Sequence, residues 1–158
     1  MTATPPRRPR VVVCGLGPAG PELVTAAVTA AVARVPHRFV RTTHHPAVSV
    51  VGEATGFDPL YDAAGRIEDV YPAIVEALVD AAERHGEVLY AVPGSPVVAE
   101  HTVERLLADE RVEVELVAGM SFLELAWLRL GVDPVERGVR LVDGHRFGVE
   151  AAGEAAQD

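Results

Sequence analysis

The stretch V-V-V-C-G-L-G-P-A-G, residues 11–20, decides the fold expected for this 158-residue chain. A short apolar run that ends in glycine is typical of a strand buried on both faces of a parallel sheet. Pro21 follows directly and suits the first turn of a helix, because its missing N–H costs nothing there. We expect that helix to run to Arg34. Strand, glycine turn and helix in this order predict an α/β unit whose loop can bring its backbone close to a ligand.

The alternation of strand and helix continues outward from this unit. We expect strands at 39–40, 48–51, 88–92 and 112–118, helices at 67–85, 97–109 and 121–130, and a loop over 52–66. In the helix 97–109, the side chains of Val103, Leu106 and Leu107 should face inward. The strand 112–118 alternates Val and Glu, as a strand near the edge of a sheet does.

This pattern predicts a three-layer α/β domain, in which helices flank a mostly parallel sheet. The domain should span residues 10–143, with a disordered arm at 1–9 and a loose tail at 144–158.

Composition excludes several classes of partner. The formal net charge is −9, and the only basic cluster is Arg7, Arg8 and Arg10, which argues against nucleic acids and anionic membranes as partners. Residues 1–9 lack the apolar core of a signal peptide, and no apolar run approaches the roughly 18 residues that would span a bilayer. Cys14 is the only cysteine, so we expect a packed thiol in a reducing, cytoplasmic setting.

Three loops that contain glycine follow three of the expected strands, at 15–20, 93–96 and 118–121. Since the carboxyl ends of parallel strands share one edge of the sheet, these loops should line one crevice for a small-molecule ligand. The first loop also matches G-x-G-x-x-G, which a dinucleotide site would follow with an acidic residue about 20 positions later. Arg41 is found there instead and could accept the 2′-phosphate of NADP, so an NADP-binding reductase remains an alternative.

Three segments together resemble a known family. V-V-V-x-G-L-G-P-A-G-x-x-L-V-T (11–25), Y-A-V-P-G-S-P (90–96) and V-A-G-M-S-F (117–122) are similar, in order, to signatures of the S-adenosylmethionine-dependent tetrapyrrole (corrin/porphyrin) methylases. Y-A-V-P-G-x-P-x-V-A-E-x-T-V, G-x-S-F-L and L-G-V-D-P look like the branch fused to a MazG-type nucleotide pyrophosphohydrolase. The resemblance covers about residues 10–143 and implies the N-terminal half of the methylase fold.

The resemblance implies S-adenosyl-L-methionine as cofactor and a methyltransferase activity. The positions that match cofactor-contacting residues of the family come from all three loops: Gly15, Gly17, Pro18, Pro93, Gly94, Ser95, Val98, Ser121 and Phe122. No catalytic base is indicated, and we expect no metal site.

The sequence departs from the family pattern in ways that bear on activity. Ser95 replaces the usual aspartate of the second signature, and Arg41 lies near the place of the acidic catalytic residue found in uroporphyrinogen methylases. Neither the family's second α/β domain nor the E-E-x-x-E helix of the pyrophosphohydrolases is recognisable in the 158 residues. These departures favour an alternative, a non-catalytic ligand-binding or interaction module associated with a MazG-like partner.

Other polar groups have simpler interpretations. Glu76, Asp80 and Glu83 lie at helical spacing and predict a solvated acidic face rather than a Mg²⁺ site, and we read Glu100 and Glu104 in the same way. His44 or His45 could reach the ligand crevice. The helix 121–130 carries a large apolar surface, formed by Leu123, Leu125, Trp127, Leu128 and Leu130, which predicts a homodimer interface if it is exposed.

Overall fold

The computed structural model of the chain describes residues 8–144 and 147–148. The predicted arm at 1–9 and tail at 144–158 therefore lie largely outside the described residues. The chain divides into two compact units, Met1–Leu125 and Ala126–Asp158. The first unit contains the whole sheet and all the residues predicted to bind the cofactor.

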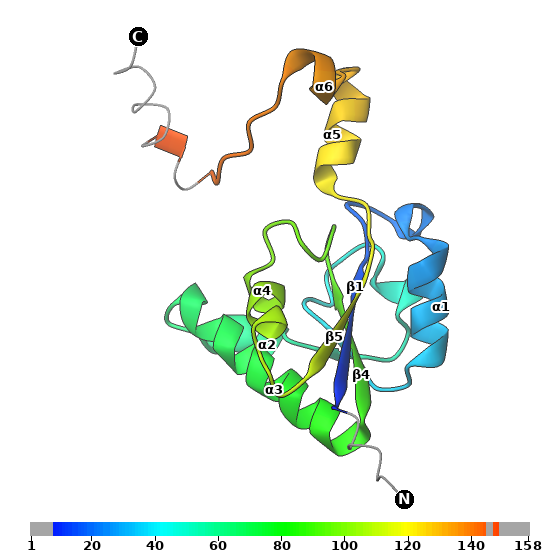
Figure 1. Cartoon of the computed structure of the whole chain (residues 1–158), viewed down its shortest axis with the longest axis vertical. Helices are drawn as coiled ribbons and strands as arrows, with labels where there is room; N and C mark the ends of the chain where they lie inside the picture. Colours follow the sequence, from blue (N-terminus) through cyan, green and yellow to red (C-terminus); the bar gives the residue numbers. More distant parts are fainter. Residues whose placement is uncertain (1–7, 145–146, 149–158) are drawn as a thin grey trace, which may run out of the picture. The chain divides into compact units, whose positions relative to one another are not determined.

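A single five-stranded sheet forms the centre of the first unit (Figure 1). Its strands are β1 (Arg10–Gly15), β2 (Arg38–Val40), β3 (Thr55–Gly56), β4 (Glu87–Val92) and β5 (Glu113–Val117). They lie in the order β3-β2-β4-β1-β5, and every pair is parallel. β5 is an edge strand, as its alternating Val and Glu predicted.

Helices cover both faces of this sheet. The α-helices are α1 (Ala26–Arg34), α2 (Asp58–Ala63), α3 (Val70–His85), α4 (His101–Leu107), α5 (Phe122–Leu130) and α6 (Pro134–Arg137), with 3-10 turns η1 (Pro21–Leu23), η2 (Val48–Val50) and η3 (Ile67–Asp69). α1 lies on one face, and α2, α3 and α4 lie on the other (Figure 1). The predicted three-layer α/β fold with a parallel sheet is confirmed.

The apolar run of β1 explains why the fold has a core on each side. Side chains alternate across a strand, so Val11 and Val13 pack toward α3 and α4 while Val12 and Cys14 pack toward α1. All four are fully buried. A strand covered on both faces needs apolar residues at every position, which is the pattern that the sequence shows.

Two elements in the first third of the chain differ from the sequence-based prediction. The helix expected over 21–34 is divided into η1 and α1, because Val24 and Thr25 are extended and the Thr25 hydroxyl accepts a hydrogen bond from the Val28 N–H at 3.3 Å, which caps α1. The strand expected at 48–51 is wrong, since these residues form η2. The third strand is β3, inside the stretch predicted to be a loop. An apolar run this short fits either a strand or a buried turn, and periodicity does not distinguish the two.

The helix expected over 97–109 is also shorter than predicted. α4 begins only at His101, because Ala99 adopts a positive φ of 56° and Glu100 has φ −116° and ψ 82°, neither of which continues a helix. Val103 and Leu106 are buried as expected, whereas Leu107 is 53% exposed and its predicted inward orientation is wrong. Within the described residues, no helix is long and apolar enough to cross a bilayer.

Candidate functional site

The first two glycine loops are joined at the carboxyl ends of β1 and β4. The Leu16 N–H donates to the Val92 carbonyl at 2.8 Å, directly beyond the last paired residues of the two strands. Gly17 and Gly94 then exchange two hydrogen bonds, of 3.1 Å from the Gly17 N–H and 2.8 Å from the Gly94 N–H. Both glycines have positive φ angles, 78° and 65°, which side chains rarely tolerate.

The third glycine loop packs against the first with no space between their backbones. A Cβ atom added to Gly15 would lie 2.4 Å from the Gly94 carbonyl oxygen and 2.8 Å from the Gly119 Cα. The Thr25 hydroxyl donates to the Ala118 carbonyl at 3.1 Å, which ties the start of α1 to the same loop. The prediction that the three loops gather along one edge of the sheet is confirmed.

A cavity of about 320 Å³ lies over these loops, and we call it the glycine pocket. Its lining residues are Gly17, Pro18, Arg41, His45, Pro93, Gly94, Ser95, Val98, Ala99, Glu100, Ser121 and Phe122. Every residue that the sequence placed at a cofactor site lines it, except Gly15, which is buried and packs against Gly94 and Gly119. Arg41, His45, Ala99 and Glu100 complete the lining.

Arg41 and Glu100 form a partly buried ion pair in the pocket wall. An Arg41 Nη1–H donates to a Glu100 carboxylate oxygen, and the Arg41 Nε–H donates to the Tyr61 hydroxyl at 3.1 Å. The side chain of Glu100 is only 4% exposed and that of Arg41 is 29% exposed. The expectation that Glu100 lies on a solvated face is therefore wrong. The break in the chain at Ala99 turns Glu100 inward, whereas Glu104 is exposed on α4 as predicted.

The ionisation of this pair is set by burial and by mutual attraction. Burial raises the pKa of Glu100, and the Arg41 guanidinium opposes that rise only in part. Burial lowers the pKa of Arg41, but the Glu100 carboxylate and Tyr61 outweigh it, so the pKa of Arg41 lies above its usual range. The guanidinium that could have met a 2′-phosphate is thus already paired with a carboxylate, which weighs against the NADP alternative.

The loop after β2 brings His45 to the pocket. Asp58, at the start of α2, anchors this loop, because its carboxylate accepts hydrogen bonds from the Thr42 hydroxyl (2.5 Å), the Thr43 N–H (2.8 Å) and the Thr43 hydroxyl (2.9 Å). Burial alone would raise the pKa of Asp58, but these hydrogen bonds hold it well below its usual range. Of the two histidines expected near the crevice, His45 lines the pocket, whereas the His44 side chain is 84% exposed.

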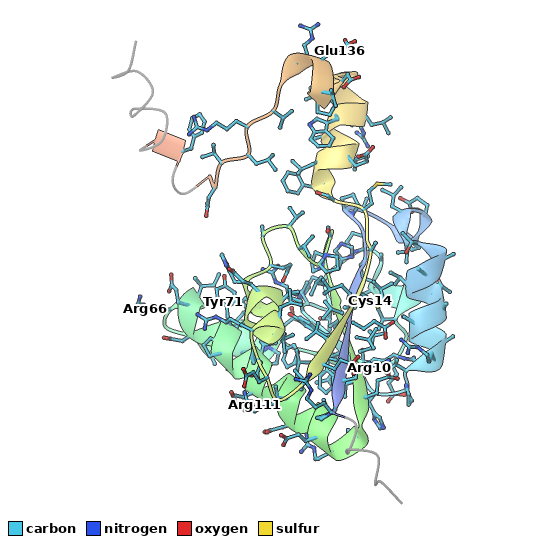
Figure 2. The ribbon with its side chains drawn as sticks, viewed as in Figure 1. Arg10, Cys14, Arg66, Tyr71, Arg111 and Glu136 are labelled. Atoms are coloured by element: carbon cyan, nitrogen blue, oxygen red, sulfur yellow. The ribbon has the colours of Figure 1, made fainter. Side chains whose placement is uncertain are left out.

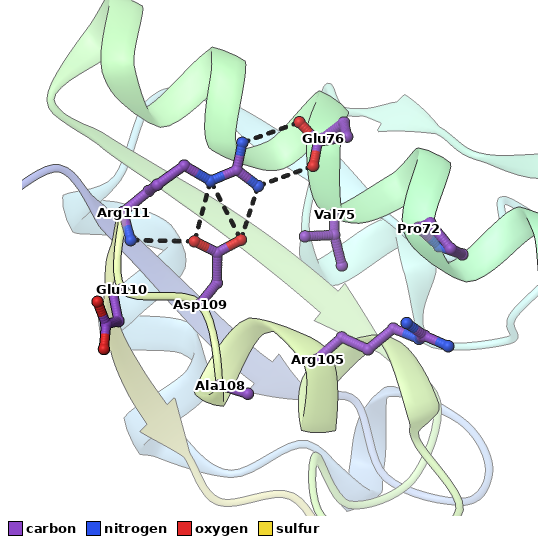
Figure 3. A pocket seen from close by; sticks show the side chains of 8 residues that line it. All are labelled: Pro72, Val75, Glu76, Arg105, Ala108, Asp109, Glu110 and Arg111. Atoms are coloured by element: carbon purple, nitrogen blue, oxygen red, sulfur yellow. Dashed lines mark hydrogen bonds and ion pairs between the residues drawn. The ribbon is translucent and has the colours of Figure 1, made fainter.

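A larger cavity, of about 520 Å³, lies between α3 and α4 (Figure 3). Arg111 dominates it and is fully engaged there, with hydrogen bonds of 2.7 and 2.9 Å to Glu76 and contacts of 2.7 to 3.3 Å to Asp109. Glu76 therefore takes part in an ion pair on an exposed helix face. Among residues 8–144 and 147–148, no group of three His, Cys, Asp or Glu side chains is placed to hold a metal ion.

Cys14 is a packed thiol, as the sequence predicted. It lies in the interior of the sheet (Figure 2) and is fully buried. Burial raises the pKa of Cys14 to about 12, so the reactive thiolate is absent near neutral pH.

Comparison with known proteins places this geometry in a family. The model of the Tetrapyrrole (Corrin/Porphyrin) Methylases matches residues 10–152. YabN of Bacillus subtilis (strain 168), described as an uncharacterized protein, is 35% identical over 141 residues, which are 85% of this chain and 28% of YabN. The chain thus spans little more than a quarter of that relative.

Solved structures share the fold. The precorrin-6Y methylase CbiE of Archaeoglobus fulgidus matches with a TM-score of 0.63 and 19% identity, over 86% of this chain and 65% of CbiE. A uroporphyrin-III C-methyltransferase of Thermus thermophilus matches with a TM-score of 0.61 and 24% identity, over 83% of this chain and 56% of that one. The residues that the family model matches, 10–152, include all three glycine loops and the whole sheet. The chain therefore belongs to the tetrapyrrole (corrin/porphyrin) methylase family.

Proposed function

We propose that this chain binds S-adenosyl-L-methionine in the glycine pocket and contributes to methyl transfer. The observation that carries the proposal is that residues from three separate loops, each matching a signature of the family, surround one cavity. The bound cofactor would supply the methyl group. The residues of this chain would bind the cofactor, orient it and exclude water.

The lining of the pocket fits the two ends of such a cofactor. Ser95 and Ser121 accept hydrogen bonds from Val97 N–H and Leu123 N–H at 3.5 and 3.2 Å, so each hydroxyl hydrogen can still be donated to a carboxylate. Val98 and Phe122 offer apolar surface for adenine. The space beside Gly94 is open, since a Cβ added there would meet no atom within 4 Å. The volume lies within the range of small-molecule sites, roughly 300–1,000 Å³.

A solved relative supports the choice of ligand. A Thermus thermophilus uroporphyrin-III C-methyltransferase was crystallised in complex with S-adenyl homocysteine, and its chain matches this one with a TM-score of 0.52 and 21% identity over 74% of this chain and 51% of that chain. That ligand belongs to the relative. Because this chain shares the fold and has the matching loops, we propose that it binds a ligand of the same kind.

Isothermal titration with S-adenosylmethionine and S-adenosylhomocysteine tests the proposal. We expect saturable binding by the wild-type chain and at least about a tenfold loss in Val98→Trp, where the indole would fill the pocket. Val97→Trp is the matched control, because the side chain of Val97, next to Val98 in the sequence, is exposed and does not line the glycine pocket. NADPH should give no heat. If neither S-adenosylmethionine nor S-adenosylhomocysteine gave binding heat at millimolar concentration, the proposal would be contradicted.

The pocket also supports a second candidate, a ligand-binding module without catalysis. Among the described residues that line the pocket, Glu100 is the only carboxylate, and it is held by Arg41 and poorly placed to accept a proton from a substrate. In this case the ligand would bind without transfer of its methyl group to any acceptor. A methylation assay with radiolabelled cofactor, run on protein that binds the ligand by calorimetry, distinguishes the two.

We further propose a cytoplasmic setting and a homodimer, with a MazG-like pyrophosphohydrolase as a second partner. No residue of α5 is buried, and Leu128 and Leu130 are exposed, which suits an interface. Sedimentation equilibrium of the chain alone measures whether it forms a homodimer. The same measurement with a MazG-type protein added tests the second association. A mass equal to the monomer at all concentrations, in both experiments, would contradict them.

A further inference from the structure

The ion pair in the wall of the glycine pocket is held in place by the elements on both sides of it. The Arg41 N–H donates to the Ala91 carbonyl of β4 at 2.9 Å, and the Arg41 Nε–H donates to the Tyr61 hydroxyl of α2 at 3.1 Å. The Glu100 carbonyl accepts two hydrogen bonds, each of 3.1 Å, from N–H groups in the first turn of α4. The sheet and two helices thus fix where the two charged side chains begin.

The chain adopts an unfavourable conformation to place Glu100 in this wall. Ala99, directly before it, has a φ of 56° and is the only non-glycine residue with a positive φ in the part of the chain that the structure describes. Such a conformation persists only where the surrounding structure enforces it, and it is common at ligand sites. A buried ion pair is often no more stabilising than apolar side chains of similar volume, so stability alone does not account for this arrangement.

Part of the hydrogen-bonding capacity of the pair is unused. The hydrogen bond between the two side chains joins Arg41 Nη1 to Glu100 Oε1. Within residues 8–144 and 147–148, Arg41 Nη2 and Glu100 Oε2 have no hydrogen-bond partner. Both residues line the glycine pocket. The wall of the pocket therefore holds one unused donor on a cation and one unused acceptor on an anion.

This combination is complementary to a zwitterion. The carboxylate of an α-amino acid group can accept a charge-assisted hydrogen bond from a guanidinium, and its ammonium can donate one to a carboxylate. A ligand with a single charge would fit less well. A lone anion is attracted by Arg41 and repelled by Glu100, and a lone cation meets the opposite balance.

We propose that the Arg41–Glu100 pair recognises the α-amino acid end of the ligand in the glycine pocket, with Arg41 binding its carboxylate and Glu100 its ammonium. This inference rests on the proposed function, because S-adenosylmethionine and S-adenosylhomocysteine both carry this zwitterion. It is compatible with the free hydroxyl hydrogens of Ser95 and Ser121, since one carboxylate can accept about four hydrogen bonds.

Calorimetry with truncated ligands tests the inference on the wild-type chain. 5′-Methylthioadenosine keeps the adenosine and the sulfur of S-adenosylhomocysteine and lacks its amino acid group. We expect S-adenosylhomocysteine to bind at least about tenfold more tightly, because its charge-assisted hydrogen bonds to Arg41 and Glu100 are absent from the shorter ligand. Decarboxylated S-adenosylhomocysteine, which keeps only the ammonium, should lose most of this advantage.

Two double variants show whether the pair is responsible for the preference. Arg41→Met/Glu100→Leu leaves no unpaired charge and should lower the preference for S-adenosylhomocysteine to less than about twofold, mainly through weaker binding of that ligand. Glu104→Leu/Arg105→Met is the matched control, because it removes the same two charges from exposed positions of α4 that do not line the glycine pocket. It should keep the full preference.

A single substitution, Glu100→Gln, covers the case in which the double variant does not fold. Glutamine keeps the size of the side chain and an oxygen for Arg41, but it removes the negative charge that would hold the ammonium. This variant should bind S-adenosylhomocysteine about fivefold or more weakly than wild type and 5′-methylthioadenosine about equally well. Circular dichroism checks that each variant is folded.

The outcomes separate this inference from the proposed function. Equal affinities of the wild-type chain for the two ligands would overturn the inference and leave the proposed function standing, because the adenosine half would then account for the binding. A preference that the Arg41→Met/Glu100→Leu variant retains, or that the control variant loses to the same extent, would also overturn it. If neither ligand bound at millimolar concentration, the proposed function would fail, and the role of the pair would fail with it.

Discussion

At the scale of single residues, the Arg41–Glu100 pair is the most consequential feature of the pocket wall. Each charge is costly to bury by itself, and each is stabilised by the other. Tyr61 further fixes the guanidinium through its hydroxyl. The two side chains therefore line one side of the pocket with no net charge between them.

Removing the Arg41 guanidinium should destabilise the fold, because the buried Glu100 carboxylate loses its partner. We expect Arg41→Met to lower the free energy of unfolding by about 3 kcal/mol at pH 7, because Glu100 would remain buried without its partner. The pKa of Glu100 in the folded variant would rise further above its unfolded value. The loss should therefore grow as pH rises through that pKa and shrink toward pH 5. Urea denaturation at several pH values measures it.

The double variant Arg41→Met/Glu100→Leu is the control for this prediction. It removes both charges and should recover most of the lost stability, because no unpaired group remains. A single variant as stable as wild type would show that the pair contributes nothing to the fold. A double variant no more stable than the single one would show that the unpaired carboxylate is not the cause of the loss.

At the scale of elements, the site depends on how closely the loops at the strand ends approach one another. Gly15, Gly94 and Gly119 meet backbone to backbone, and Gly17 needs a positive φ to exchange its two hydrogen bonds with Gly94. Loops held in this way present backbone groups to a ligand at fixed positions, so little ordering is needed when the ligand binds.

A methyl group at the meeting point should separate the loops. We expect Gly119→Ala to lower the free energy of unfolding by about 2 kcal/mol, because its Cβ would lie 2.4 Å from the Gly15 carbonyl oxygen. It should also weaken the binding of S-adenosylhomocysteine. Gly65→Ala is the matched control, with open space around the added Cβ, and should change stability by less than about 0.5 kcal/mol. Equal thermal unfolding curves for the two variants would refute this packing.

At the scale of the first unit as a whole, the two cores share the strands β1 and β4. β1 lies between β4 and β5, and its alternate side chains contribute to both cores. The unit should therefore unfold cooperatively, since neither layer of helices can leave without exposing the apolar side chains of the same strands.

Cys14 reports on that cooperativity. As the chain's single cysteine, buried within β1, it should react with a thiol reagent only through opening of the sheet. We expect the labelling rate in low urea to follow the population of globally unfolded molecules measured by circular dichroism. Labelling that is fast in native buffer and insensitive to urea would indicate local opening of β1. Labelling in 6 M urea is the control for an accessible thiol.

Local sequence determined much of this protein. Two strands were specified by apolar runs, at 11–14 and 88–92, that end at a glycine or a proline, and the main helix was specified by the helical spacing over 67–85. These elements also set the edge of the sheet where the glycine loops meet, because periodicity and turn chemistry act over short distances. Family signatures then placed all but one of the predicted site residues around one pocket.

Only the tertiary structure decided the rest. Val48–Val50 forms a 3-10 turn instead of a strand, and Val48 packs against the core beside α1; a short apolar run can pack there in either shape, so its sequence did not distinguish the two. Glu100 turns inward because Ala99 adopts a positive φ and Arg41, 59 positions away, supplies a partner. His45 lines the glycine pocket because Asp58 anchors its loop. Each of these outcomes depends on groups distant in sequence, whose proximity is created by the folded chain and leaves no local pattern.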